Sequence, residues 1–275
     1  MKLLRIAVGL LFCLSVCLFA VFYVRDRKTD KTYPRITVEG DIIDVSLQAD
    51  RAELLKGVSA FDEKDGDITG KIIIESVSRF TDPGVSVVTY AVCDNDNHTA
   101  TATRKIRYAN YEAPTFSMSD SMVFGLSERV SVLDRVHATD LIDGDISQKI
   151  VITAADYQAN VTGIFNMSAR VSNSKGDVIY LELPIYVEDI SPAAPEIELS
   201  EYLVYLAPGE SISPESYLVS ATDVNGEDLT ALVRTDSGLD TSVPGTYQVH
   251  FYVSDAAERQ QHTVLTVIVE EAEEK

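Results

Sequence analysis

Three short acidic segments contain the residues of this chain that are best suited to binding chemistry. Each segment reads Ala-x-Asp-x-x-(Asp/Gly)-(Gly/Glu)-Asp-(Ile/Leu)-(Thr/Ser), and the copies occupy residues 60–69, 138–147 and 221–230. A second polar position follows each copy at the end of an apolar run. These second positions are Asp94, Asn173 and Asp255. Carboxylate and amide oxygens that meet on one loop are the ligands that calcium takes, about six to eight at a time.

Calcium binding and turn formation are the two roles that these carboxylates could have. Asp and Asn also accept hydrogen bonds from their own backbone in tight turns, and Gly66 and Gly144 supply the positive φ that such turns need. The twelve-residue calcium loop with its final Glu does not occur, and the drift to Gly-Glu-Asp in the third copy favours the turn. We expect no cofactor other than calcium. The candidate calcium ligands are Asp62, Asp65, Asp67, Asp94, Asp140, Asp143, Asp145, Asp223, Asp228 and Asp255.

The acidic segments belong to a set of landmarks that repeat together along the chain. Their first Asp recurs at intervals of 78 and 83 residues. A turn glycine, at Gly84, Gly163 and Gly245, recurs at intervals of 79 and 82 residues. This period is too long for a solenoid unit and suits a small autonomous domain. The chain is therefore predicted to be a tandem array.

Each repeat shows the two-residue period of half-buried strands. Val88, Tyr90 and Val92 alternate with less apolar neighbours and are predicted to face inward. The matching inward positions are Phe165, Met167, Ala169, Val171, Tyr247, Val249, Phe251 and Val253. The strands before the acidic segments are predicted to face inward through Val58, Ala60, Val136, Ala138, Val219 and Ala221. Short strands at regular spacing predict an all-β fold of three tandem immunoglobulin-like antiparallel sandwiches.

Residues 6–24 form an apolar run without a charge. A helix of this length just spans about 30 Å of hydrocarbon. Bulky Phe19, Phe22 and Tyr23 continue to the end of the run, which favours an uncleaved signal-anchor over a cleaved signal peptide. We therefore predict a single-pass protein of the cell membrane, with residues 1–33 forming a short cytoplasmic tail, a transmembrane helix and a stalk. The bulk of the chain is then extracytoplasmic.

Prolines mark the predicted joints between the repeats. Pro34, Pro114 and Pro195 each begin a repeat, and proline stiffens such connections because it fixes φ. The predicted domains are 34–110, 111–189 and 190–271.

The repeats resemble bacterial immunoglobulin-like repeats of cell-surface proteins, a type also found in a pesticidal crystal protein. The resemblance rests on the A-x-D-x-x-D-G-D-I-T turn, on P-G-x-x-x-V-x-Y-x-V-x-D and on a terminal strand, and it covers the chain after residue 33. The second repeat departs from the pattern, with Thr162-Gly163 for Pro-Gly and Asn173 for Asp. The resemblance implies a sandwich fold on a secreted or membrane-anchored bacterial protein, without enzymatic activity. In this topology the acidic turn and the last hairpin turn share one end of the domain.

The composition limits the possible partners and chemistries. The net charge is −20, and a surface that acidic repels phosphate backbones, so nucleic acid is not expected as a partner. Only Cys93 lies outside the N-terminal apolar run, so no disulfide within a domain is expected. Asp236-Ser237-Gly238 imitates an aspartic-protease motif but occurs once, and the four histidines are scattered along the sequence. No constellation for an enzyme is found.

These observations predict a protein of adhesion, protein–protein interaction or spacing at the bacterial cell surface. Its expected partners are the membrane, through the N-terminal helix, and another surface or envelope protein. The alternative is a module that binds cell-wall glycan or calcium through the loops at one domain end. Thirteen tyrosines could stack on sugars, but Trp is absent.

Overall fold

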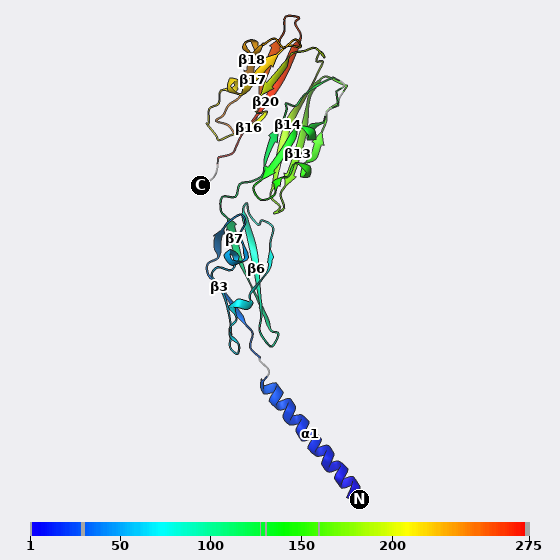
Figure 1. Cartoon of the computed structure of the whole chain (residues 1–275), viewed down its shortest axis with the longest axis vertical. Helices are drawn as coiled ribbons and strands as arrows, with labels where there is room; N and C mark the ends of the chain where they lie inside the picture. The colour runs from blue at the N-terminus through cyan, green and yellow to red at the C-terminus, as the bar shows by residue number, and fades with distance from the viewer. Residues whose placement is uncertain (1, 29–30, 127, 130, 159, 273–275) are drawn as a thin grey trace. The chain divides into compact units, whose positions relative to one another are not determined.

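The chain forms two compact units, Met1–Asn110 and Tyr111–Lys275, each built from pairs of β-sheets (Figure 1). The fold is mostly β-sandwich, as the strand pattern predicts. The only long helix among the described residues is α1 (Lys2–Lys28). The computed structural model describes residues 2–28, 31–126, 128–129, 131–158 and 160–272, and gives residues 2–7 and 24–28 by their backbone alone.

The first unit contains a three-stranded and a four-stranded sheet. The small sheet has the order β1 (Arg35–Val38), β3 (Val58–Asp62), β4 (Gly66–Asp67). The larger sheet has the order β2 (Ile42–Val45), β7 (Thr99–Tyr108), β6 (Val85–Cys93), β5 (Ile73–Val77). Figure 1 shows β3 beside β6 and β7. A short helix, α2 (Arg51–Leu54), and a 3₁₀ helix, η1 (Thr69–Lys71), lie in the connections.

The second unit contains two such pairs of sheets. The first pair has the orders β11 (Gly144–Asp145), β10 (Val136–Asp140), β8 (Thr115–Met118) and β12 (Val151–Ala155), β13 (Gly163–Ser172), β14 (Val178–Glu188), β9 (Val123–Gly125). The second pair has the orders β15 (Glu196–Leu199), β17 (Leu218–Thr222) and β16 (Leu203–Leu206), β20 (Gln260–Val269), β19 (Gly245–Ser254), β18 (Arg234–Ser237). The connections carry the 3₁₀ helices η2 (Val132–Asp134), η3 (Ser147–Lys149), η4 (Pro214–Tyr217) and η5 (Thr230–Leu232).

The same connectivity occurs in all three pairs of sheets. A short strand pairs in parallel with the last strand: β2 with β7, β9 with β14 and β16 with β20. The last two strands form a long antiparallel hairpin in each pair. This arrangement agrees with the landmarks of the sequence. The bounds 34–110, 111–189 and 190–271 stay a prediction, because the compact units are two.

The cores lie where the two-residue period predicts them. Val88 and Tyr90 are fully buried, and so are Val249 and Phe251 at the matching positions of the third pair of sheets. Phe165 and Tyr247, at the far end of their strands, are only half-buried. Pro184 lies in β14 beyond the segment that β9 covers, so it occupies an open edge, where proline is tolerated.

One predicted inward residue is wrong. Val219 is 53 % exposed, whereas Ala221 in the same strand is buried. The pairing of β17 with β15 shifts between Glu198 and Leu199, so Leu199 lies opposite Leu218. Leu218 therefore packs against the core in place of Val219, because a shift of one residue exchanges the two faces of a strand.

The predicted membrane anchor is also wrong. Among the described residues, the structure contains no helix with the length and apolar character that crossing a membrane requires. The single-pass membrane localisation, the signal-anchor and the membrane as partner are therefore not supported. Residues 25–28 of the predicted stalk continue the helix.

Phe251 provides a test of the core assignment. We expect Phe251→Ala to destabilise its sandwich by about 3–5 kcal/mol, because the change removes a fully buried ring and leaves a cavity. Leu232→Ala, at a 59 % exposed position, should change stability by no more than about 0.5 kcal/mol. Urea unfolding of the full chain, followed by circular dichroism, measures both. Equal effects of the two changes would contradict the assignment.

Candidate functional site

The first and last residues of each acidic segment close a turn by bonding to one another. The Ala60 N–H donates to the Thr69 hydroxyl (3.0 Å), and the Ile68 N–H donates to the Ala60 carbonyl (3.0 Å). Ile68 is thereby placed in the core. The same two bonds recur between Ala138, Ser147 and Ile146, and between Ala221, Thr230 and Leu229. The motif therefore requires a hydroxyl at its last position and an apolar residue before it.

The first Asp of each segment is a cap for the turn. Asp62 is buried, and its Oδ1 accepts the N–H groups of Lys64 and Asp65, both at 2.9 Å. Asp140 accepts those of Ile142 and Asp143 in the same way. A buried carboxylate needs such partners, because losing them would cost the desolvation of its charge.

The third copy forms a related turn with the glycine one residue earlier. Asp223 Oδ1 accepts from Asn225 and from Glu227, so the second bond spans one residue more than in the other copies. The residue with positive φ is again the glycine. Gly226 lies three residues after the first Asp of its segment, whereas Gly66 and Gly144 lie four residues after theirs. The change from Asp-Gly-Asp to Gly-Glu-Asp thus keeps a capped turn.

The last Asp of each segment fixes the following 3₁₀ helix. Asp67 Oδ1 accepts the Thr69 N–H at 2.9 Å. Hydrogen bonds from the Thr69 hydroxyl and N–H hold the pKa of Asp67 below its ordinary value. Asp145 with Ser147, and Asp228 with Thr230, repeat this arrangement and its effect on the pKa.

The second polar positions cap the last hairpin. Asp94 Oδ1 accepts the N–H groups of Asp96 and His98, both at 2.8 Å, and Asp94 Oδ2 lies 2.9 Å from the His98 ring. Burial raises the pKa of Asp94, but these donors outweigh it and hold the pKa below its ordinary value. Asn173 and Asp255 make the same pair of backbone bonds in their hairpins.

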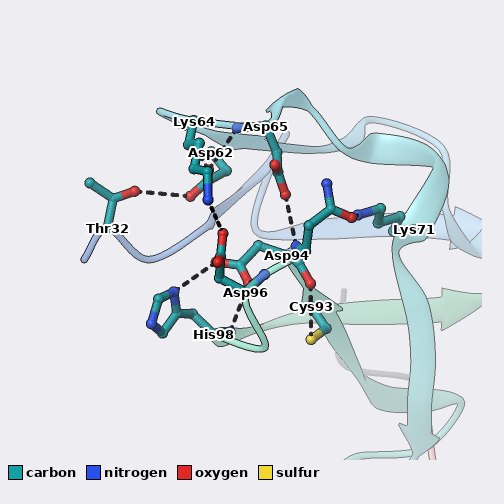
Figure 2. A network of polar contacts seen from close by, with 10 residues as sticks. Thr32, Asp62, Lys64, Asp65, Lys71, Cys93, Asp94, Asp96 and His98 are labelled. Atoms are coloured by element: carbon teal, nitrogen blue, oxygen red, sulfur yellow. Dashed lines mark hydrogen bonds and ion pairs between the residues drawn. The ribbon is translucent and has the colours of Figure 1, made fainter. Parts of the chain in front are cut away.

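The two turns meet, as the sequence predicts, in the first two copies. Figure 2 shows Lys64 paired with Asp96. Asp65 Oδ2 accepts the Asn95 N–H at 2.8 Å. Lys71 donates to the Asn95 side chain at 2.7 Å. In the second copy the amide of Asn173 donates to Asp140 Oδ2 at 3.0 Å. In the third copy Asp255 bonds Arg259 at 2.6 Å instead.

The donors around these carboxylates support the turn interpretation. The oxygens accept bonds from backbone N–H groups, lysine, arginine and histidine, which are the donors that satisfy a capped turn. Among the described residues, no group of three His, Cys, Asp or Glu side chains is arranged to hold a metal ion. Calcium binding by the ten predicted aspartates stays a prediction.

The sequence missed a cluster of histidines. His250 on β19 and His262 on β20 lie with Nδ1 and Nε2 2.9 Å apart, and His262 Nδ1 lies 2.7 Å from Glu188 Oε1. The interpretation of these histidines as scattered is therefore wrong. The hairpin register pairs His250 with Val264 and Tyr252 with His262, so both imidazoles lie on one face. Aligning β19 and β20 as an antiparallel hairpin about the turn between them would have predicted that the two histidines lie close together.

A row of exposed side chains crosses the outer face of the sheet formed by β12, β13 and β14. Val151 pairs with Arg170, and Arg170 pairs with Tyr180, so the three residues lie side by side on neighbouring strands. Tyr180 is 70 % exposed and Val151 49 %, and Arg170 is exposed as well. Such a row is invisible until the strand register is known.

Comparisons with known proteins find partial sequence similarity to two longer proteins. No family model matches the chain. Pesticidal crystal protein Cry22Aa of Bacillus thuringiensis is 35 % identical over 127 residues, covering 44 % of this chain and 16 % of that protein. An uncharacterized 81.3 kDa protein of Acholeplasma phage L2 is 44 % identical over 59 residues, 21 % of this chain and 8 % of that protein. The chain therefore spans less than a fifth of either relative's length. The predicted resemblance to repeats of the crystal protein is confirmed as a weak sequence similarity.

The similar solved structures match this chain only at low TM-scores. One holds the M60 catalytic domain with two CBM51 domains of Clostridium perfringens ZmpB (TM-score 0.25, 13 % identity, 87 % of this chain and 31 % of that one). Another is the extracellular domain of Protocadherin GammaB4 (TM-score 0.20, 14 % identity, 87 % and 50 %). A third is surface layer protein SbsC, domains 4–9 (TM-score 0.20, 13 % identity, 86 % and 50 %).

Thr69 tests the closure of the acidic turn. We expect Thr69→Val to lower the free energy of unfolding by about 1–3 kcal/mol, because valine keeps the shape but leaves the Ala60 N–H without its acceptor. Thr101→Val, at an exposed position of β7, is the matched control and should be nearly neutral. Chemical denaturation compares the two variants. If Thr69→Val unfolds like Thr101→Val, the hydroxyl does not close the turn.

The capping carboxylates also predict the response to acid. The folded-state pKa values of Asp67, Asp143, Asp145 and Asp228 lie below the ordinary 3.8. Their stabilisation is therefore complete above pH 3.8 and is lost as the pH falls through the lowered values. We expect the thermal unfolding midpoint, measured at pH values from 7 to 2, to decrease once the pH falls below 3.8. Asp143→Asn should reduce the drop, because Lys149 and Ser174 stabilise that charge; a midpoint that rises in acid would contradict this.

Proposed function

We propose that this chain is a non-enzymatic binding protein that recognises a protein partner at a cell surface through the outer faces of its four-stranded sheets. The observation that carries the proposal is the exposed row Val151, Arg170 and Tyr180. Tyrosine and arginine contribute much of the binding energy in protein interfaces. A solvated sheet face is ordinarily polar, so a row with an aromatic ring and a β-branched side chain suits a partner's surface.

The three pairs of sheets present different side chains at this position. The corresponding row is Ile73, Ala91 and Thr101 in the first pair of sheets. In the third pair Arg234 and Tyr252 occupy it, and the next position, His262, is buried. One scaffold with three different rows is what a tandem immunoglobulin-like array offers for recognition, since function resides in sites carried on a fold. The acidic turns, in contrast, repeat the same structural bonds.

The edge and the charge of the chain add to this proposal. Strand β12 is the last strand of its sheet, and all five of its residues are exposed, so a partner has access to the row from the side. The net charge of −20 favours the approach of a partner with a basic surface, by raising the association rate at low salt.

Capture of surface proteins by the immobilised full chain tests the proposal. We expect Tyr180→Ala and Arg170→Ala each to weaken capture about tenfold or more, the loss typical of central interface residues. The matched controls are Tyr33→Ala and Arg107→Ala, which remove an exposed tyrosine and arginine from the first unit.

Two outcomes would overturn the proposal. Capture that the Tyr180 and Arg170 variants leave unchanged would show that the row does not bind. Retention of the chain on purified cell-wall glycan, lost in the same two variants while protein capture is absent, would make the row a glycan site instead.

A further inference from the structure

Three ionisable groups form a hydrogen-bonded file between two sheets of the second unit. Glu188, at the end of β14, lies 2.7 Å from Nδ1 of His262 on β20. Nε2 of His262 lies 2.9 Å from Nδ1 of His250 on β19. His262 is 5 % exposed and His250 is half-buried. The file is thus the polar part of the joint between the β14 sheet and the β20 sheet.

Aromatic and apolar side chains hold the two imidazoles in place. The Tyr186 ring, on β14, meets both imidazoles edge-on, at 5.6 Å from His250 and 5.5 Å from His262. Tyr252 stacks on His262 with ring centroids 4.6 Å apart. Val123, Tyr186 and Val264 form a small buried cluster across the same joint. Rings enclosed in this way keep their hydrogen-bond geometry.

The chemistry of the file fixes where its protons lie. A carboxylate only accepts, so His262 Nδ1–H donates to Glu188. In neutral His262 the other nitrogen, Nε2, is then an acceptor, and His250 Nδ1–H donates to it. The free lone pair of the file is at His250 Nε2. The next proton therefore adds a positive charge to the half-buried ring of His250. A further proton, on Nε2 of His262, would place that N–H against the Nδ1–H of His250.

We propose that this joint is proton-linked: it is closed when His250 is neutral and weakens when His250 takes up a proton. The inference goes beyond the proposed binding function, since it concerns how the two sheet pairs of the second unit are held together. It does not depend on which partner binds.

The surrounding charges set the direction of the effect. Burial and the neighbouring His262 lower the pKa of His250, while Asp236, its cross-strand partner, and Glu188 raise it in part. Asp189, Tyr186 and Tyr252 line the same cavity of about 580 Å³. Because the pKa of His250 is lower in the closed joint than the ordinary 6.5, the closed state is favoured above pH 6.5 and loses its advantage as the pH falls. One linked proton changes the opening equilibrium by at most about tenfold per pH unit.

Nitrogen-detected NMR of the full chain with labelled histidine tests the proposal, since only four histidines are present. At pH 7.5 we expect His262 as the Nδ1–H tautomer and nuclear Overhauser contacts from both imidazoles to the Tyr186 ring. As the pH falls below 6.5, His250 should become charged and the contacts to Tyr186 should fade together with that change. Full contacts that persist after His250 has become charged would overturn the proposal.

His250→Asn is the decisive variant. The asparagine amide can donate to His262 from the place of Nδ1 but cannot take up a proton, so the contact between His262 and Tyr186 should survive to pH 5. His137→Asn, which changes a histidine of β10 outside the joint, should leave the pH response unchanged. If His250→Asn loses the contact at the same pH as the original chain, the histidine pair does not control the joint. If it lacks the contact even at pH 7.5, a neutral hydrogen-bonding group at this position does not keep the joint closed, which also contradicts the proposal.

Discussion

A buried carboxylate at the end of a strand must be hydrogen-bonded, and this constraint organises the first two pairs of sheets. Asp62 and Asp140 satisfy it by accepting backbone N–H groups of the turn that follows them. This turn also brings Ile68 or Ile146 back into the core, because the backbone N–H of that isoleucine donates to the carbonyl of the alanine that begins the motif. One polar interaction therefore fixes the direction of the chain and the placement of an apolar residue. Since a buried carboxylate without hydrogen-bond partners is costly, loss of these hydrogen bonds would disrupt both the direction of the chain and the placement of the isoleucine.

The same principle extends to the last hairpin and separates architecture from recognition. Asp94, Asn173 and Asp255 cap their hairpin turns, and Lys64 or Asn173 joins the two turns of one domain end. Polar groups used in this way are committed to holding the fold. The side chains that differ between the sheet pairs lie instead on the outer faces of the sheets, as with Arg170 and Tyr180, and at the joint formed by Glu188 and the two histidines. These are the places where binding and regulation are proposed.

The sequence predicted those features that depend on local pattern. Alternation placed Val88, Tyr90 and Phe251 in the core, because one face of each strand is buried over most of its length. It placed Val219 wrongly, because a shift in pairing is decided by the neighbouring strand and leaves no trace in the strand's own residues. Arg104 was not anticipated as a buried residue: its charge suggests exposure, but its guanidinium reaches Leu54 O and the Tyr90 hydroxyl, both at 3.0 Å.

The most direct test of this account compares Asp62→Asn with Asp62→Ala by thermal unfolding, each in calcium and in a chelator. A cap acts through an acceptor oxygen, which asparagine retains at the Oδ1 position and alanine lacks. The account predicts that the asparagine variant melts close to the original chain and the alanine variant several degrees lower, with and without calcium, as a loss of about 1 kcal/mol or more implies. Equal destabilisation in both variants, together with a calcium-dependent midpoint in the original chain, would contradict it and make the acidic turn an ion site.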